Sequence, residues 1–538
     1  MKGREKKSIL VLAAVLFLAG WAASAFQGRT CHFPEVPQPA SIQTTDLSAK
    51  GIRAEDDFVS EELENVTGKT NYRDLKLLVD ETFTSNLPLV VIDTGEHTIK
   101  VSTMWDDEKK CFVPIEGDPY VYGEISVVDN LDGPNRPTDD AGTHSLCKLR
   151  VRGNNSVNYD KKQYLIKLLN EKGKSRKQNM LGMGSDSEWI LNVSFIDKSL
   201  LRNYLAYVTA GELMPYTPDV RFCEVLWKEQ KGYRYEGVYM MMESIGVGKN
   251  RVDLPQYSEN SAITPSLLRR DRYNVNGIML DNYGTRNGLT YGYLDIEYPD
   301  REVISPKSIQ NITEQIDRFE QALYADSWEE FIEYRNYVDM QSFVDYFILN
   351  EFFLNYDAGY NSTYVYMNYS KKLTMGPVWD FDQAMDNDWM GAANLQATAF
   401  HSAPWFDRIV QDPVFTAAVI ERYAKLRESI LSDEEIEAFI GKTVAYLGMA
   451  VERDWARWGY YYTEGNYLQK AGADGKYRNT STHQEEVERI LRCLSEHGAW
   501  MDAHLDGLYQ FKRLSLEDAI ALSREEEKDY RPGLAVVF

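Results

Sequence analysis

The sequence is poor in cysteine and histidine. Five cysteines and seven histidines occur among 538 residues, and none of them forms a CxxC or HExxH pattern. This spacing excludes a disulfide-dense scaffold and a zinc ribbon, and it argues against a zinc hydrolase. It leaves one or two disulfide bridges open without assigning them, among Cys31, Cys111, Cys147, Cys223 and Cys493.

Positive charge is also scarce. Lysine and arginine number 59 against 82 aspartates and glutamates, so the net charge is −23. Residues 1–25 carry four positive charges and one negative charge, so the chain without them has a net charge of −26. Such an acidic surface argues against non-specific binding to nucleic acid or to anionic lipid. It suits an exported protein, or one that acts on basic partners.

Long hydrophobic runs are absent except at the N-terminus. There a basic start (KGREKK) precedes the apolar run SILVLAAVLFLAG, and Ala23-Ser24-Ala25 follows with small residues. This order is typical of a secretory signal peptide, so we predict cleavage before Phe26 and a secreted or cell-surface protein. An uncleaved signal anchor is the alternative, because the apolar run nearly reaches spanning length.

The rest of the chain divides by composition. Residues 26–85 are rich in proline, serine, threonine and acids and read as a linker, whereas residues 511–538 form a charged tail. Between them, residues 86–300 have strand-like patterns and residues 301–510 have helical ones. The sequence therefore predicts an α+β fold, with a β-rich N-terminal half and a helical C-terminal half.

A small-residue loop lies inside the β-rich half. Strand patterns cover 87–94, 97–104, 120–128 and 144–152, and the last strand ends at Arg152. The loop GNNS follows, and a further strand starts near Lys162. Gly153 permits close backbone approach, and the side chain of Asn154 can reinforce a tight turn.

Lys167 stands out in the strand that follows this loop. In an extended YLIKL segment, Lys167 shares a face with Leu165 and Leu169, which is an unusual setting for a charged group. We interpret it as a functional lysine that points inward. The alternative is a lysine at the edge of a sheet that extends its charged end into solvent.

Helices are predicted around a second strand pair. Residues 197–214 have helical spacing with Asp197 as N-cap, and residues 221–245 form two strands, the second closed by Glu243. Residues 339–355 give the strongest helix, with one broad apolar face. Further helices are predicted over 312–324, 328–337, 413–431, 432–458 and 482–511.

The most informative stretch is 355–387, which follows that strongest helix. Residues 363–367 (TYVYM) and 372–378 (KLTMGPV) read as two strands of a hairpin, joined by a turn over NYSK. Paired strands lie about 5 Å apart, so the open end of the hairpin brings Asp357 and Asn361 beside Asp380 and Asp382.

Three carboxylates and one amide at such an end suit a hard divalent cation. The simpler alternative is a polar hairpin end with solvated acids. Trp379 and Phe381 argue against it, because large apolar residues between the acids indicate a partly buried wall, where unpaired charge is costly.

The order of these parts is that of a protein kinase. A small-residue loop and a strand lysine come first, followed by Asp357, Asn361 and then Asp380, which matches loop, lysine, catalytic Asp, metal-binding Asn and metal-binding Asp. The common kinase strings are absent, since no GxGxxG, HRD or DFG occurs. Asn361 also follows Asp357 one residue earlier than the kinase spacing requires.

The sequence resembles the CotH kinase family, the spore-coat-protein-H-like atypical kinases. The resemblance covers roughly residues 86–510 and rests on a combination of segments in family order. These segments are RGNNS with KKQYLIKL, WILNVSFIDKSLLRNYLA, YEGVYMMMESI with NRVDL, and NEFFLNYDAGYNSTYVYM with GPVWDFDQAM. It implies an atypical protein-kinase-like fold and ATP-dependent phosphorylation of Ser or Thr in exported proteins.

The resemblance also implies roles for particular residues. Asp357 would be the catalytic base, and the metal, Mg²⁺ or Mn²⁺, would be held by Asp380 and Asn361 with support from Asp382. Lys167 would pair with the ATP phosphates, with Lys162 as the second choice. The remaining nucleotide-side residues would be Arg152, Asn154 and Glu243.

Three other functions stay open at this point. A catalytically inactive module could use the same fold for adhesion or assembly, although the joint presence of the implied site residues argues against it. A metal-dependent glycosyltransferase would use Asp380-Phe381-Asp382 as its DxD motif, but the chain lacks a Rossmann-like start. A kinase-like fold could also transfer another part of the nucleotide. The expected partners are ATP and an exported protein with Ser or Thr acceptors, without nucleic acid and without a membrane beyond a signal anchor.

Overall fold

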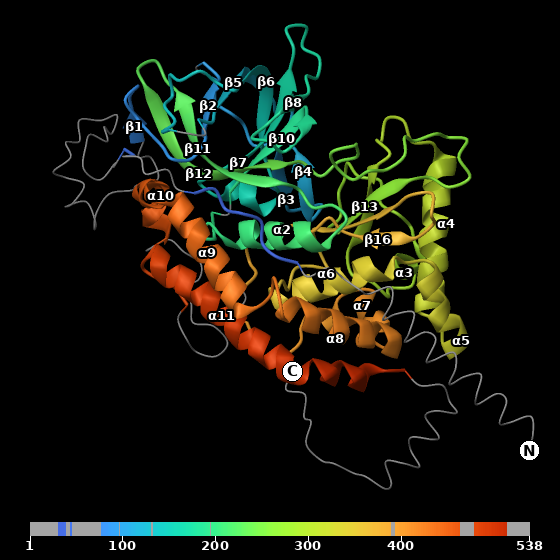
Figure 1. Ribbon diagram of the computed structural model, residues 1–538. Coiled ribbons are helices and arrows are strands. Elements are labelled where there is room, and N and C mark those ends of the chain that lie inside the picture. The colour runs from blue at the N-terminus through green and yellow to red at the C-terminus, as the bar shows by residue number, and fades with distance from the viewer. Residues whose placement is uncertain are drawn as a thin grey trace, which may run out of the picture.

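The computed structural model describes residues 31–38, 44–45, 77–95, 97–130, 133–193, 195–388, 393–462 and 478–513 (Figure 1). The predicted signal peptide, most of the predicted linker and nearly all of the charged tail lie outside these residues. Within them, the expected α+β class is observed, with strands in the front half and helices in the rear half. The kinase-like character of the fold stays a prediction.

A closed β-barrel forms the front half. Its strands pair in the order β12-β10-β7-β6-β5-β2-β11, and β11 pairs with β12 again, which closes the sheet. Only β2 and β11 run parallel among these pairs. The short strand β1 (Leu77–Val79) also pairs with β12. The barrel strands are β2 (Leu89–Asp93), β5 (Val121–Val128), β6 (Thr143–Arg152), β7 (Gln163–Leu169), β10 (Glu188–Asn192), β11 (Val220–Lys228) and β12 (Tyr233–Glu243).

Alternation along the strands decides which side chains fill the barrel. Tyr164, Ile166 and Leu168 of β7 join the buried cluster inside it, whereas Leu165 packs with the helical half. Lys167 shares the outer face with Leu165, because neighbouring residues of a strand point to opposite sides. The three consecutive methionines 240–242 are all buried and so serve as core residues.

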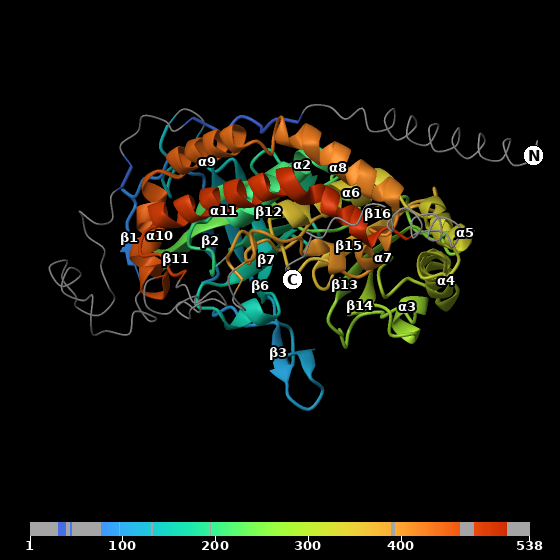
Figure 2. The same ribbon diagram turned by 90° about the horizontal axis from the view of Figure 1, so that it is seen from below.

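A hairpin of β3 (Thr103–Asp106) and β4 (Cys111–Pro114) projects from the barrel, as Figure 2 shows. The strand predicted over 97–104 is wrong for most of its length, because residues 97–102 are irregular and the strand begins at Thr103. A second small pair, β8 (Gln178–Asn179) and β9 (Ser185–Asp186), lies between β7 and β10 in the chain.

A separate four-stranded sheet carries the predicted hairpin. Its order is β14-β13-β15-β16, and β15 (Thr363–Met367) pairs with β16 (Leu373–Met375) as expected. The sequence analysis missed β13 (Ser266–Asp271), which pairs with β15 on its other side. Within residues 277–298, part of the region with strand-like patterns, only β14 (Tyr293–Tyr298) is a strand of this sheet, because the short helix α3 (Tyr283–Arg286) lies before it.

The long helices follow the predicted order, whereas the short helices α3 and α7 (Phe406–Ile409) were not predicted. The helix predicted over 312–324 begins earlier, at Pro306, and the one predicted over 328–337 becomes a 3-10 helix after Phe331. The helix predicted over 197–214 begins only at Arg202, and the helix predicted over 432–458 divides at Gly448, which has a φ of +49°. The helices are α2 (Arg202–Leu213), α3 (Tyr283–Arg286), α4 (Pro306–Leu323), α5 (Trp328–Phe331), α6 (Met340–Phe352), α7 (Phe406–Ile409), α8 (Pro413–Arg427), α9 (Asp433–Leu447), α10 (Met449–Tyr460) and α11 (His483–His504).

Helix α6 is the centre of the helical half. Asp339 caps it by accepting a hydrogen bond from the Ser342 N–H, and nearly every residue of the helix is buried. The helix ends at Phe352, five residues before Asp357. A fully packed helix therefore fixes the start of the segment 355–387.

Helix α10 joins the two halves. Its Asp454 pairs with Lys161 at 2.6 Å and its Arg453 with Glu224 of β11 at 2.6 Å, all fully buried. No disulfide joins any of the five cysteines, which are all described and all buried. No helix within the described part of the chain has both the length and the apolar composition of a membrane span.

Candidate active site

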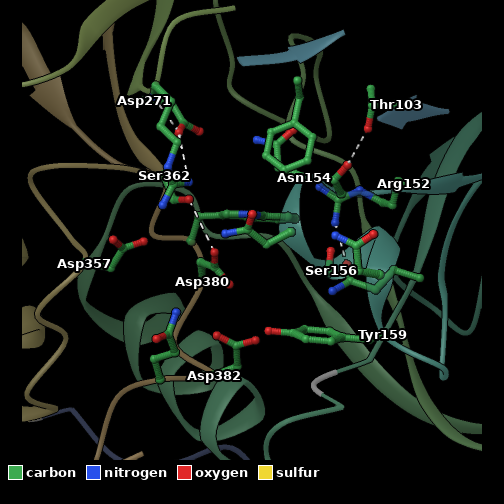
Figure 3. Close-up of a pocket in the computed structure, with 18 of the residues that line it drawn as sticks. Thr103, Arg152, Asn154, Ser156, Tyr159, Asp271, Asp357, Ser362, Asp380 and Asp382 are labelled. Carbon is green, nitrogen blue, oxygen red and sulfur yellow. Dashed lines mark hydrogen bonds and ion pairs between the residues drawn. The ribbon is translucent and has the colours of Figure 1, made fainter. Parts of the chain in front are cut away.

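A cavity of about 1020 Å³ lies where one end of the barrel meets the four-stranded sheet. Figure 3 shows its two walls: Asp271, Asp357, Asp380 and Asp382 lie on one side, and Arg152, Asn154 and Ser156 lie on the other. The acids come from the sheet and the loops around it. The opposite wall comes from the barrel end, so the cavity collects segments that are more than 200 residues apart in the sequence.

The GNNS loop forms the barrel-side wall. Gly153 has a φ of +113°, and a Cβ atom there would collide with the Ser156 hydroxyl, so only glycine fits without displacement. The Thr103 hydroxyl donates to the Gly153 carbonyl at 3.3 Å, which ties the loop to the projecting hairpin. A short 3-10 helix, Asn155–Asn158, completes the turn. Asn154 lines the cavity as expected.

Arg152 is the cation that faces the acids across the cavity. Its Nη1 donates to Gln163 Oε1 at 2.8 Å, and its guanidinium lies 5.3 Å from the centre of the Trp379 ring. Burial lowers the pKa of Arg152, and the nearby Tyr364 and Asp380 oppose that shift. Within the described part of the chain, no carboxylate forms an ion pair with Arg152, so its charge is available to an anionic ligand.

The predicted acids come together as expected. Asp357, Asp380 and Asp382 all line the cavity, and the Ser362 hydroxyl donates to Asp380 at 3.4 Å. Burial raises the pKa of Asp380 to about 6, and the Asp357 carboxylate adds to the shift. Burial and the Asp380 carboxylate raise the pKa of Asp382 well above its usual value. Burial also raises the pKa of Asp357, partly offset by a hydrogen bond from Asn361. The wall therefore favours either protonated carboxyls or a bound cation.

Asn361 lies behind Asp357 and is itself buried. Its Nδ2 donates to Asp357 Oδ1 at 2.7 Å, and its backbone N–H donates to the Asp357 carbonyl at 3.0 Å. The side-chain oxygen Oδ1 is buried and has no hydrogen-bond partner among the described residues. A buried amide oxygen without a partner costs free energy unless a donor or a metal ion satisfies it.

These groups fit a hard divalent cation. No three Asp, Glu, His or Cys side chains of the described ranges converge closely enough to hold an ion by themselves. The donor set is instead the two carboxylates Asp380 and Asp382, which line the cavity, whereas Asn361 lies behind Asp357 and outside the lining. Mg²⁺ is commonly bound by one or two carboxylates, with water and substrate phosphates as its other ligands. A two-carboxylate site of this kind therefore suits it.

Helix α2 holds the acid wall in place. Asp380 has a φ of +66°, and its N–H donates to the Tyr207 hydroxyl at 3.3 Å, whereas the Phe381 N–H donates to Asn203 Oδ1 at 2.7 Å. Arg202 bonds the carbonyls of Ala384 and Met385 beyond Asp382. Asp197, the predicted N-cap, instead accepts the backbone N–H and the guanidinium of Arg202. Three α2 side chains thus fix the backbone on both sides of Asp382.

Three predicted nucleotide-side residues do not line the cavity. Lys167 pairs with Glu188 at 2.7 Å, and Glu243 accepts hydrogen bonds from Tyr216 and Arg251. Strand pairing explains why Lys167 and Glu243 lie away from the cavity. Lys167 lies opposite Glu188, and Glu243 lies opposite Trp189, the next residue of β10. At the end of β7 that meets the cavity, Gln163 lies opposite Arg152. The four residue steps from Gln163 to Lys167 span roughly 13 Å along the strand, so Lys167 lies well away from the cavity end.

Lys162 is closer to the cavity but also outside its lining. Its ammonium donates to the Val157 carbonyl at 2.9 Å and so supports the 3-10 turn from behind. Neither predicted lysine therefore lines the cavity, and its barrel-side wall carries the arginines Arg150 and Arg152 instead.

The sequence analysis missed several residues that line the cavity. Asp271 ends β13 and is buried, and Tyr159 points its hydroxyl toward Asp382 in Figure 3. Neither has a sequence signal: Asp271 is the last residue of a strand that was not predicted, and Tyr159 lies in a polar loop. Gln163 and Asn192 also line the cavity beside Arg152, and only the strand pairing of the folded barrel brings them there.

Comparison with models of protein families gives a match. A family model described as "CotH kinase protein" matches residues 149–501, which is more than half of the chain and includes every predicted site residue. No curated protein matches the sequence.

Proposed function

The chain belongs to the CotH kinase family, and from that membership we propose that it transfers the γ-phosphate of ATP to Ser or Thr hydroxyls of exported or cell-surface proteins. The observation that carries the proposal is the pairing of two unlike walls in one cavity. One wall offers carboxylates, and the other offers Arg152, which has no ion pair among the described residues, beside a tight glycine loop. Phosphoryl transfer needs both, because the reacting phosphates carry charge that metal and cation must neutralise.

Arg152 and the GNNS loop serve the phosphates. The Gln163 bond and the Trp379 ring hold the guanidinium in one orientation, facing Asp380 across the cavity. Arginine offers a fork of donors that matches phosphate oxygens. The loop backbone can approach a phosphate closely at Gly153, because no Cβ is present there.

Asp357 serves the acceptor hydroxyl. Asn361 donates to its Oδ1, so Oδ2 remains for a hydroxyl proton from the cavity. Burial raises the pKa of this carboxyl, which makes it a better proton acceptor once it is ionised. A base in this position orients the hydroxyl and takes its proton as the phosphoryl group transfers.

Asp380 and Asp382 would hold Mg²⁺ or Mn²⁺. Such an ion, when bound, would neutralise the phosphate charge that develops during transfer. Without it, the buried carboxylates of this wall repel one another, which matches the raised pKa of Asp380 and Asp382. Helix α2 keeps their backbone fixed whether or not the ion is bound.

The compartment and the partner are parts of the same proposal. The basic and apolar N-terminus supports export, and the acidic composition supports a protein that acts outside the cell without contacting nucleic acid. N-terminal sequencing of the secreted protein should begin at or near Phe26. A membrane-bound chain that retains Met1 would contradict cleavage and leave the anchor alternative.

The decisive experiment compares Asp357→Asn with the parent chain. The variant keeps size and removes the proton acceptor, so it should bind ATP and Mg²⁺ nearly as the parent does while turnover falls by about 10²-fold or more. Transfer of labelled phosphate to a Ser-rich peptide measures turnover, and calorimetry measures binding.

Two control variants sharpen this result. Asp380→Asn should instead remove Mg²⁺-dependent ATP binding, and Asp300→Asn, an exposed acid outside the cavity, should change neither quantity. If Asp357→Asn turns over like the parent, the base is a different residue. If the parent transfers phosphate to no hydroxyl acceptor, the chain is a binding module and the proposal is wrong.

A further inference from the structure

Exposed aromatic side chains gather beside the mouth of the cavity. Tyr273, Tyr291 and Tyr293 lie on or next to β13 and β14 and are 49%, 64% and 39% exposed. Tyr360, three residues beyond Asp357, contacts Tyr291 and is partly buried. These four residues form a feature that we call the tyrosine ridge. A cluster of exposed aromatic side chains is more typical of a binding surface than of the rest of a protein's surface.

The ridge has a fixed shape. Tyr273 and Tyr293 meet edge to face with centroids 5.6 Å apart, and Tyr291 and Tyr360 do so at 5.9 Å. Gly292 joins the two pairs, because a Cβ there would lie 3.0 Å from the Asp271 carbonyl oxygen and 3.1 Å from that of Tyr360. The turn before β14 therefore packs backbone to backbone against the Asp357 segment, which holds the ridge beside the site.

The ridge also joins two cavities. Tyr273 lines the main cavity together with Asp357. Tyr360 lines a second cavity of about 400 Å³, which Phe400 and His401 border on its far side. The two cavities share Tyr356, so they lie on either side of the Asp357 segment. A chain that presents one residue to Asp357 can thus continue along the ridge toward the second cavity.

Building on the proposed kinase function, we propose that the tyrosine ridge binds the polypeptide acceptor in extended form on one side of its reacting hydroxyl. Ring geometry favours a polypeptide over a sugar chain. The pairs meet at 74° and 67°, so the surface is notched rather than flat. Notches accept side chains, and phenol hydroxyls can bond peptide groups, whereas sugar rings pack on flat aromatic faces.

The test uses the double variant Tyr291→Ala/Tyr293→Ala and acceptor peptides of two lengths. Both side chains are exposed, so the fold should persist. For a 25-residue peptide with a central serine, KM should rise about tenfold with kcat nearly unchanged, as expected for the loss of two binding anchors. For a five-residue peptide, KM should stay the same, because that peptide ends before the ridge. The KM for ATP should also stay the same.

The matched control is Tyr122→Ala/Tyr369→Ala, which removes two exposed tyrosines that line neither cavity. It should leave every constant unchanged. An unchanged KM for the long peptide in the ridge variant would show that the tyrosine ridge does not bind the acceptor, and it would leave the kinase proposal intact. Lost binding of cellohexaose or chitohexaose, with unchanged peptide kinetics, would make the ridge a sugar site and overturn the proposal. A parent chain that transfers no phosphate to either peptide would remove both proposals.

Discussion

At the scale of single residues, Arg152 and Lys167 give opposite expectations. Arg152→Lys should weaken ATP binding about tenfold, because lysine cannot keep both the Gln163 bond and the stacking on Trp379. Lys167→Ala should leave ATP affinity within about twofold of the parent, since Lys167 pairs with Glu188 outside the cavity. Titration calorimetry with ATP and Mg²⁺ measures both. A larger loss of ATP affinity in Lys167→Ala than in Arg152→Lys would instead identify Lys167 as the residue that binds the phosphates.

The glycine of the loop supports a second prediction at this scale. Gly153→Ala should cost about 1–3 kcal/mol of strain or displace Ser156, and so weaken ATP binding. Gly173→Ala is the matched control: its φ is also positive, at +70°, but no atom lies within 4 Å of the added Cβ. Equal loss of ATP affinity in both variants would show that the loop does not contact the nucleotide.

Single residues also show where the sequence stops being informative. The alternation in YLIKL correctly predicts that Lys167 shares a face with Leu165, but not that this face lies outside the barrel. Which end of β7 meets the cavity depends on pairing with β6 and β10, and a sequence pattern does not contain that pairing. Asp357, Asp380 and Asp382 were predictable because one local hairpin brings them together.

At the scale of elements, α2 and α11 hold the acid wall through one buried ion network. Arg202 of α2 pairs with Asp197 and with Glu486 of α11, at 2.6 and 2.7 Å. Burial alone would raise the pKa of Glu486, but Arg202, Arg489 and a bond from the Thr480 hydroxyl lower it to about 2. The network is long-range in sequence, so the helical pattern of either helix could not predict it.

This low pKa gives a pH prediction. Glu486 ionises near pH 4.5 when unfolded, so its stabilising effect is complete above that pH and is lost as pH falls toward 2. Glu486→Gln should lower the free energy of unfolding by roughly 2–3 kcal/mol at pH 7, and the gap should narrow steadily below pH 4.5. Urea denaturation at several pH values measures this. Glu488→Gln, which changes an exposed neighbour on α11, should have the same free energy of unfolding as the parent. A difference between Glu486→Gln and the parent that does not change with pH would contradict the low pKa of Glu486.

At the scale of the whole molecule, the barrel and the helical half share one site and several buried contacts. The closed, mostly antiparallel barrel was not predictable from short strand patterns, because closure depends on β12 pairing with both β10 and β11. It also argues against the glycosyltransferase alternative, which requires a parallel doubly wound sheet. The cavity lies between the halves, so its geometry depends on how firmly α10 joins them.

Asp454 tests that connection. Its carboxylate accepts bonds from Lys161 and from the Val238 N–H of β12, and both ionic side chains are fully buried. Asp454→Ala would leave the Lys161 charge buried without a partner, so it should lower the free energy of unfolding by about 3–5 kcal/mol. Glu421→Ala, which breaks the exposed pair with Lys425, should cost about 0.5 kcal/mol or less.

Because α10 contacts the barrel directly, thermal unfolding of Asp454→Ala should remain one transition by both circular dichroism and tryptophan fluorescence. Two separate transitions would mean that the barrel unfolds independently, and then ATP binding, which needs both walls, should be lost at the first of them.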